Sequence, residues 1–151
     1  VILDQLAKLA ILDGLPYGGP GINVLPFFNI VHVYNTGAAF SFLAHQGGWQ
    51  RWFFALFAIG VSAAMTVGLR RQAANQLWLN LAFVLVIGGA IGNLIDRLVY
   101  GHVVDFLLFY WQGYIFPAFN LADCAITVGA VMIVLDGLRK KPEQPDEQKA
   151  S

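Results

Sequence analysis

The sequence predicts a mostly α-helical membrane protein: a bundle of four transmembrane helices, the first of them truncated, with a small extracytoplasmic β-sheet. Composition is the first observation behind this prediction. Hydrophobic residues make up 58% of the 151 residues and charged residues only 12%, whereas a soluble domain carries about a quarter charged residues. A chain with so little charge cannot coat a water-soluble globule, so we expect lipid to solvate much of its surface.

Four hydrophobic segments are the second observation. Segment 52–69 contains no charged residue, and at ~1.5 Å per residue it measures roughly 27 Å, close to the ~30 Å hydrocarbon core. Segments 77–95 and 121–138 are similar. Segment 1–12 is too short to span alone, and we interpret it as the end of a longer hydrophobic helix. No basic region or cleavage site precedes it, which argues against a signal peptide.

Residues 1–138 are therefore predicted to form a single membrane-embedded domain. The polar tail 139–151 contains two prolines, and we expect it to be disordered and cytoplasmic. Its side of the membrane follows from the basic residues. Arg70 and Arg71 follow the second segment and a basic run starting at Arg139 follows the fourth. Two spans separate these clusters, so both lie on one side, which the positive-inside rule makes cytoplasmic.

The loops 13–50 and 97–119 then lie outside the cytoplasm. In the first of them, 27–34 is rich in aromatic and β-branched residues and is followed by Asn35-Thr36-Gly37. This pattern is typical of a strand that enters a turn. A small sheet on the outer membrane surface is the third element of the predicted fold.

Asp105 and Asp123 are the candidate catalytic residues. Both fall near the outer boundary of the membrane, one after the third hydrophobic segment and one at the start of the fourth. Carboxylates at this depth are costly and usually functional. Two that face each other share a proton, so one can act as base toward a water while the other protonates a scissile carbonyl. The alternative is two interfacial acids, each satisfied by a local donor.

Asn120 and Asp123 also have the spacing of a capping box at the start of a helix. A capped helix and a catalytic acid are compatible interpretations of the same residues. Because a helix N-terminus favours an anion, we hypothesise that Asp123 is the more readily ionised acid and Asp105 the more readily protonated one.

The run from Gly88 to Arg97 is the most distinctive part of the sequence. Gly88 and Gly92 form a small-residue face that predicts close helix packing. Asn93 and Arg97 are four residues apart and share a helix face, so we interpret them as support for the site. Asp96 is a candidate ion-pair partner of its neighbour Arg97.

Three further polar residues are candidates for substrate binding or site support. Asp4 and Lys8 have the i,i+4 spacing of a helix-stabilising salt bridge, although Lys8 could instead meet a lipid headgroup or a substrate. Asn35 could bind a substrate backbone, but from the sequence alone we favour a simple turn ending at Gly37.

Other chemistries lack support in the sequence. There is no HExxH, GxSxG, P-loop or paired Cys/His cluster, so neither a metal nor a cofactor is expected. A formal net charge of zero argues against a nucleic-acid partner. Cys124 adjoins Asp123 but points elsewhere on a helix, and we interpret it as a packing residue.

Five blocks of the sequence together resemble the lipoprotein signal peptidase family, also called signal peptidase II. They occur in the family's order: Asp4-x-x-x-Lys8, Asn35-Thr36-Gly37-Ala38-Ala39-Phe40-Ser41, Gly88-Gly89-Ala90-Ile91-Gly92-Asn93-Leu94-Ile95-Asp96-Arg97, Val103-Val104-Asp105-Phe106 and Phe119-Asn120-Leu121-Ala122-Asp123. Each block alone is weak, whereas all five in order are highly specific. In this family the first helix begins well before the first block, which agrees with a truncated first helix here.

The resemblance implies a multi-pass protein of the bacterial cytoplasmic (inner) membrane with its active site near the extracytoplasmic face. It implies a catalytic pair at Asp105 and Asp123, with support from Asn35, Asn93, Arg97 and Asn120, and with Asp4 and Lys8 near the site. The implied substrate is a prolipoprotein carrying diacylglyceryl on a cysteine, cleaved just before that cysteine. Membrane lipids are the other implied partners; the oligomeric state stays open.

Two other functions use the same residues. A proton-relay or transport subunit would use the acids as a proton path, but it predicts acids spread across the membrane depth. A non-catalytic scaffold held together by the glycine faces predicts that removing either carboxylate leaves function intact.

Overall fold

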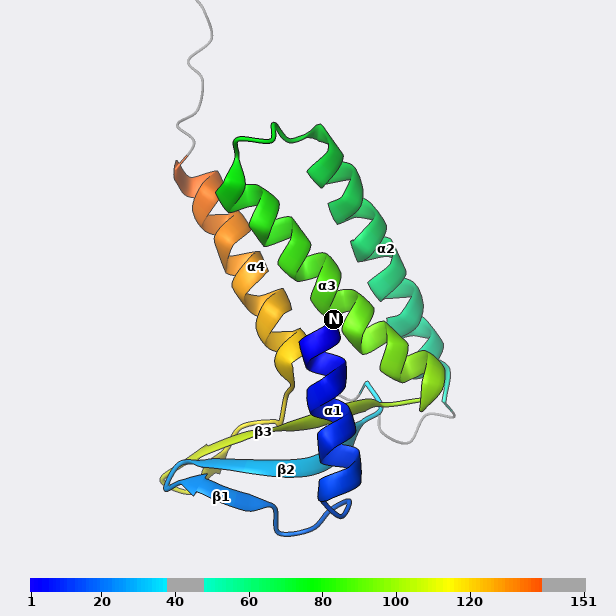
Figure 1. Cartoon of the computed structure of the whole chain (residues 1–151), viewed down its shortest axis with the longest axis vertical. Coiled ribbons are helices and arrows are strands. Elements are labelled where there is room, and N and C mark those ends of the chain that lie inside the picture. Colours follow the sequence, from blue (N-terminus) through cyan, green and yellow to red (C-terminus); the bar gives the residue numbers. More distant parts are fainter. Residues whose placement is uncertain (38–47, 140–151) are drawn as a thin grey trace, which may run out of the picture.

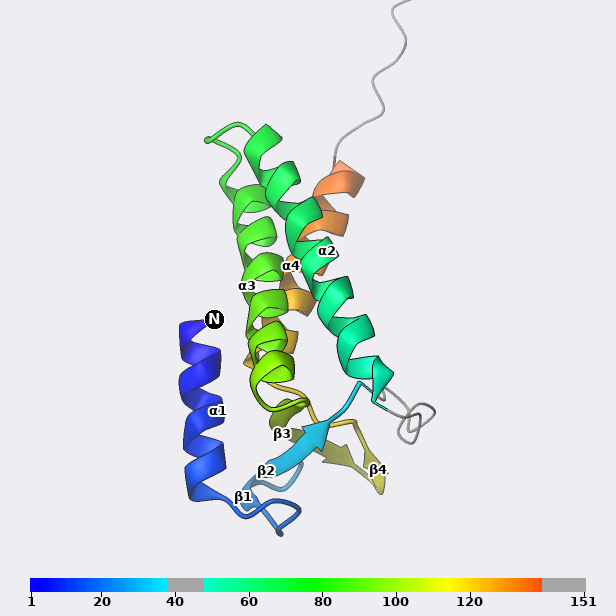
Figure 2. The ribbon, with the colours of Figure 1, turned by 90° about the vertical axis from the view of Figure 1, so that its right-hand side faces the viewer.

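The computed structural model describes residues 1–37 and 48–139. Three long helices stand side by side, a small antiparallel sheet lies at one end of them, and a shorter helix runs alongside (Figures 1 and 2). In chain order the elements are α1 (Ile2–Gly14), β1 (Ile22–Leu25), β2 (Phe28–Asn35), α2 (Trp49–Arg71), α3 (Leu77–Val99), β3 (Val103–Trp111), β4 (Tyr114–Ile115) and α4 (Leu121–Arg139).

Three helices in the described part of the chain are long and apolar enough to cross a membrane: α2, α3 and α4. They contain the three predicted full-length segments, and α1 corresponds to the short first one. Helix α3 is the central helix, since it packs against both α2 and α4. In the most apolar 18-residue stretch of each helix, 44% of α3 is buried inside the protein but only 11% of α2. Most of the surface of α2 is therefore left to lipid, and the chain is a multi-pass membrane protein.

Glycines bring α3 and α4 into close contact. A Cβ on Gly129 would lie 2.7 Å from the backbone oxygen of Ala82, and a Cβ on Gly89 would overlap the backbone oxygen of Ala122. Close packing was predicted for Gly88 and Gly92. Gly92 does lie against α4 and α1, but Gly88 meets only Val1, which precedes α1, about 4 Å away. The tight approach to α4 instead uses Gly89, one residue further along.

The sheet has the order β1-β2-β3-β4, and each neighbouring pair is antiparallel. Strand β2 confirms the predicted strand at 27–34, with bounds shifted by one residue. The register between β2 and β3 changes between Ile30 and Val33, which is a β-bulge. Strands β1, β3 and β4 were not predicted.

The segment 103–111 was interpreted as loop and is in fact the longest strand, β3. Gln112 and Gly113 both have positive φ, 46° and 86°, as a two-residue type I′ hairpin turn requires.

The basic helix ends lie far from the sheet. Arg70 and Arg71 end α2 and Arg139 ends α4, and both ends are at the opposite end of the bundle from the sheet (Figure 1). This arrangement is the one that the charge pattern predicts for a sheet on the outer side. Arg139 belongs to α4, so the predicted tail loses its first residue to the helix. Residues 140–151, like 38–41 of the second sequence block, lie outside the described residues.

Candidate active site

Asp105 of β3 and Asp123 of α4 meet at Asn120. The side-chain Nδ2 of Asn120 donates to Asp105 Oδ1 at 2.7 Å, and its backbone N–H donates to Asp123 Oδ2 at 3.2 Å. Asp105 is 2% exposed and Asn120 is fully buried. One asparagine thus contacts both carboxyl groups, where the sheet meets the helical bundle.

Local backbone structure holds both acids in place. The backbone N–H of Asp123 donates to Asn120 Oδ1 at 3.0 Å, so the two residues form the reciprocal capping box that the sequence predicts. Phe119 pairs with Leu107 of β3 in an antiparallel bridge. The segment leading into α4 is therefore tied to the strand that carries Asp105, and this brings the two acids together.

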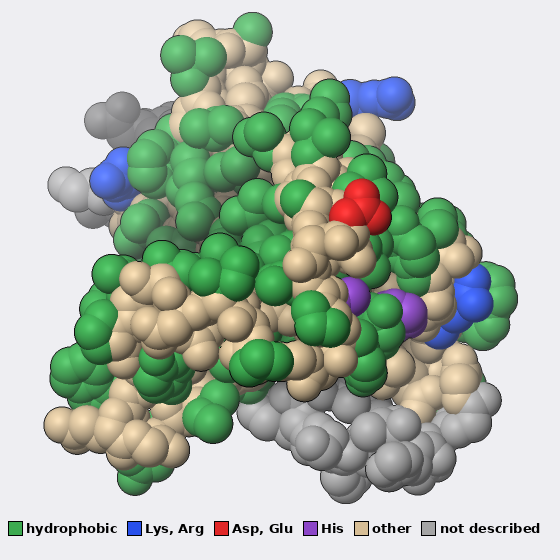
Figure 3. Space-filling model, turned by 60° about the horizontal axis from the view of Figure 1, so that its bottom comes forward, with side chains coloured by type: hydrophobic (Ala, Val, Ile, Leu, Met, Phe, Trp, Pro, Cys, Tyr) green, Lys and Arg blue, Asp and Glu red, His purple; other side chains and the backbone are tan. Residues whose placement is uncertain are grey.

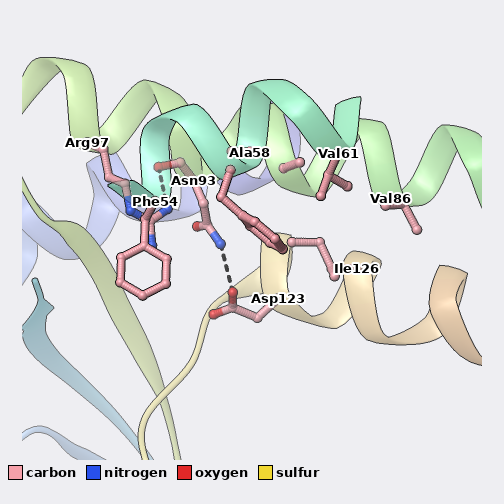
Figure 4. Close-up of a pocket in the computed structure, with 10 residues that line it drawn as sticks. Phe54, Ala58, Val61, Val86, Asn93, Arg97, Asp123 and Ile126 are labelled. Atoms are coloured by element: carbon pink, nitrogen blue, oxygen red, sulfur yellow. Dashed lines mark hydrogen bonds between the residues drawn. The ribbon is translucent and has the colours of Figure 1, made fainter. Parts of the chain in front are cut away.

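Asn93 of α3 supports Asp123 directly. Its Nδ2 donates to Asp123 Oδ1 at 2.7 Å (Figure 4). Its Oδ1 accepts from Lys8 Nζ and from Asn120 Nδ2, each at 3.1 Å. Two donors on Oδ1 orient the amide, because turning it over would bring its NH₂ group against both of them. The NH₂ group therefore points at Asp123.

Asn35 forms the predicted turn and also contacts Asp105. Its Oδ1 accepts from the backbone N–H of Gly37 at 2.9 Å, and its Nδ2 donates to Asp105 Oδ2 at 3.0 Å. Gly37 has φ 99°, which only glycine adopts readily. The turn at the end of β2 thus aims a donor at the second oxygen of Asp105.

Lys8 lies buried behind the site between two acids. Its Nζ is 2.9 Å from Asp4 Oδ2 and 2.8 Å from Asp96 Oδ2. The predicted i,i+4 pair with Asp4 is confirmed. The pairing of Asp96 with Arg97 was wrong, because α1 brings Lys8 to Asp96 instead. Lys8 is 1% exposed, so it does not reach a lipid headgroup.

The two acids of this cluster also bind the backbone of the elements that carry the candidate pair. Asp4 Oδ1 accepts from the N–H of Ala122 in the first turn of α4, and Asp96 Oδ2 accepts from the N–H of Val104, next to Asp105. Gln5, which sequence reasoning did not single out, donates to Asp96 Oδ1 at 2.8 Å. The cluster therefore joins α1 and α3 to β3 and α4.

Asp123 also borders an apolar cavity of about 200 Å³ between α2, α3 and α4. Arg97 lies at the same end; it donates to the backbone oxygen of Asn93 at 3.1 Å, and its Cζ lies 5.3 Å from the centre of the Phe54 ring. Figure 4 shows these polar groups at one end of the cavity and apolar side chains along the remainder of its wall. The sequence analysis did not identify the apolar wall of this cavity, because no sequence pattern separates apolar residues that line a cavity from those that face lipid. The wall consists of Phe54, Phe57, Ala58, Val61, Val86, Ala90 and Ile126.

Burial and, after it, the nearby charge of Asp123 raise the pKa of Asp105 from 3.8 to about 7. Hydrogen bonds from Asn35 and Asn120 and the charge of Lys8 oppose the shift. Asp105 is therefore poised to hold a proton near neutral pH.

Among residues 1–37 and 48–139, no group of three or more His, Cys, Asp or Glu side chains is placed to bind a metal ion. Cys124 is a free thiol of intermediate exposure. His32 and His102 lie in an aromatic cluster with Tyr34, whose ring centre is 5.1 Å from that of His32 and 3.8 Å from that of His102. His45 lies outside the described residues.

The fold is that of a membrane-embedded enzyme. Two solved structures described as bacterial membrane enzymes superpose on the chain with TM-scores of 0.81 and 0.80. Their sequence identities are 35% and 34%, over 93% and 95% of this chain and 88% of each of theirs.

Residues 1–139 match the family model of signal peptidase (SPase) II, and the chain belongs to this family of peptidases. Proteins named lipoprotein signal peptidase are similar along almost the whole chain. The one from Tolumonas auensis is 62% identical over 94% of this chain and 87% of its own length. The one from Aeromonas hydrophila is 59% identical over 95% of this chain and 86% of its own.

Proposed function

We propose that this protein is an aspartic peptidase that removes signal peptides from bacterial prolipoproteins, with Asp105 and Asp123 as its catalytic pair. The observation that carries the proposal is the meeting of the two carboxyl groups at Asn120, beside an apolar cavity between membrane-spanning helices. Membership of the signal peptidase II family and the names of the relatives support the reaction and the substrate class.

In the proposed mechanism Asp123 is the base and Asp105 the acid. Asp123 takes a proton from a water as the water oxygen bonds to the scissile carbonyl carbon, and Asp105 gives its proton to the carbonyl oxygen. The tetrahedral intermediate then breaks at its C–N bond. The leaving amine takes the proton held by Asp123, and the new carboxyl group returns a proton to Asp105.

The neighbouring polar residues hold the two acids in place and stabilise Asp123 in its ionised state. Asn93 and Asn120 donate hydrogen bonds that stabilise ionised Asp123, and Asn35 holds Asp105 in place from the other side. Arg97 places positive charge at the same end of the cavity as Asp123, where it stabilises the ionised base. We assign Asp4 and Lys8 a positioning role, because they contact Ala122 and Asn93 rather than the open cavity.

The apolar cavity suits the hydrophobic part of a signal peptide, which can extend along α2 and α4 while the scissile bond reaches Asp123. The substrate of the family is a prolipoprotein with diacylglyceryl on a cysteine, cut just before that cysteine. Its acyl chains fix the cleavage site at the membrane surface, at the depth of the sheet and of Asp105. The proposed location is the bacterial inner membrane, with the active site near the extracytoplasmic face.

The test is cleavage of a synthetic diacylglyceryl-modified propeptide by the purified protein in detergent micelles. Asp105→Asn and Asp123→Asn should each lower kcat by about 10²–10⁴-fold, since each removes one partner of acid–base catalysis. Asp13→Asn is the matched control, because Asp13 is exposed at the end of α1, and its turnover should equal that of the unmodified protein. Thermal unfolding of all variants excludes misfolding. Near-normal turnover in either folded active-site variant would remove the catalytic pair from the proposal.

A further inference from the structure

The sheet carries almost no charge although it lies outside the helical bundle. Residues 14–50 contain no Asp, Glu, Lys or Arg, and residues 98–122 contain only Asp105, which is buried. Viewed from the sheet end, hydrophobic and uncharged groups make up most of the described surface (Figure 3). Charged side chains are a common protection for sheets exposed to water. The absence of charge from these stretches of sequence indicates that something other than water covers part of the sheet.

One face of the sheet is aromatic. Alternate residues of β3 share a face, so Asp105, Leu107, Phe109 and Trp111 point the same way. Cross-strand partners continue this face, since Phe28 lies opposite Phe109, Tyr114 opposite Trp111 and Phe119 opposite Leu107. We call the following set the aromatic face: Phe28, Phe109, Trp111, Tyr114, Phe116 and Phe119.

Half of this face packs and half is exposed. The ring of Phe109 stacks on those of Phe28 and Phe119, with centres 4.8 Å and 5.8 Å apart. Trp111 is 62% exposed, Tyr114 77% and Phe116 58%. These three lie around the β3–β4 hairpin. Large exposed apolar patches of this kind mark an interaction surface.

The geometry indicates which partner covers it. The aromatic face is the face that bears Asp105, so it is turned toward the bundle and α4. Beyond α4 the sheet extends past the helices (Figure 1). The face is continuous with the apolar surface of α4, whose first residue, Leu121, is 37% exposed. Because α4 runs through the membrane, the space above this overhang is the outer leaflet of the bilayer.

We propose that the β3–β4 hairpin docks into the outer leaflet through the aromatic face. The indole of Trp111 and the phenol of Tyr114 lie at the headgroup level, where such rings are favoured, and Phe116 contacts the acyl chains. The partner is a phospholipid surface of any headgroup charge, since no charged side chain contributes. Docking fixes the depth of β3 and hence of Asp105. The test below reads lipid contact alone, so its outcome does not depend on whether Asp105 and Asp123 are the catalytic pair.

The test reads the depth of a single tryptophan. Replacing Trp49, Trp52 and Trp78 by Phe leaves Trp111 as the one tryptophan in the full chain, which is then placed in nanodiscs of zwitterionic phosphatidylcholine with brominated acyl chains. The matched control carries Trp111→Phe and Ile115→Trp in the same background. Ile115 is 72% exposed on the same hairpin but points to the opposite face.

Brominated lipid should quench Trp111 several-fold more strongly than the tryptophan at position 115, and aqueous iodide should show the reverse order. Adding anionic lipid or salt should change neither result. Equal quenching at the two positions, or a Trp111 that iodide reaches freely, would overturn the proposal. Protection of Trp111 from both quenchers would also overturn it, because a second copy of the chain would then cover the face.

Discussion

The raised pKa of Asp105 makes the stability of the fold depend on pH in a way that can be measured without substrate. Asp105 has an ordinary pKa of 3.8 when the chain is unfolded and about 7 when it is folded. The folded protein therefore binds this proton more tightly than the unfolded chain does. Its stabilising effect is fully present below pH 3.8 and is lost as the pH rises through about 7.

The size of the effect follows from the shift. About three pKa units at 1.36 kcal/mol each correspond to roughly 4 kcal/mol of unfolding free energy lost between pH 4 and pH 8. Asp105 is only 2% exposed, so solvent screens little of this. Asp105→Asn removes the titration and keeps the size of the side chain. The loss of stability over this pH range should be smaller in the variant by about the same amount.

The assay is denaturant or thermal unfolding in detergent micelles at a series of pH values, with the unmodified protein and Asp105→Asn side by side. Infrared spectroscopy adds a direct readout, because the carbonyl band of a protonated carboxyl group should persist to neutral pH and be weaker in the variant. Identical pH profiles for the two proteins would refute the reasoning. So would a protonated-carboxyl band that the substitution leaves unchanged at pH 6.

Two further predictions concern packing and charge. Gly129→Ala should destabilise the fold by about 1–3 kcal/mol, because the new Cβ meets the backbone oxygen of Ala82. Gly60→Ala, with no atom within 4 Å of its Cβ, should not, and equal melting temperatures in micelles would contradict the packing argument. Lys8→Met should cost about 3–5 kcal/mol, since it leaves buried acids unpaired. Adding Asp96→Asn should recover part of that loss in the same assay, and a Lys8→Met protein of normal stability would contradict the role of the ion pair.

The spanning helices could be predicted from the sequence because each lipid-facing helix needs a continuous apolar run of fixed length. Segments 77–95 and 121–138 begin at the first residue of α3 and α4. Strand β3 could not be predicted by the same logic. Its first four residues are buried and the others less so, so it lacks the alternation of polar and apolar residues that reveals an amphipathic strand. The β-branched and aromatic content of 103–111, followed by Gln112-Gly113, was the available signal.

Some contacts of the site could likewise be predicted from the sequence, whereas others depend on how the helices pack. Asn120 and Asp123 are close in sequence, so their mutual hydrogen bonds follow from helix capping alone. Asp105 and Asp123 could be paired from their place at one membrane boundary. The partner of Asp96 could not be predicted, because the choice between Arg97 and Lys8 depends on where α1 packs. No local pattern encodes that packing.

The period of β3 links the two proposals for this molecule. Asp105 and Trp111 are six positions apart in the strand, an even offset, so they share a face of it. A face that presents a carboxyl group to Asn120 near the bundle must therefore present an indole to the lipid beyond it. Moving the strand by one residue would turn Asp105 away from Asn120 and would turn Trp111 into water. The depth of the hairpin in the leaflet and the position of the acid are thus set by the same register.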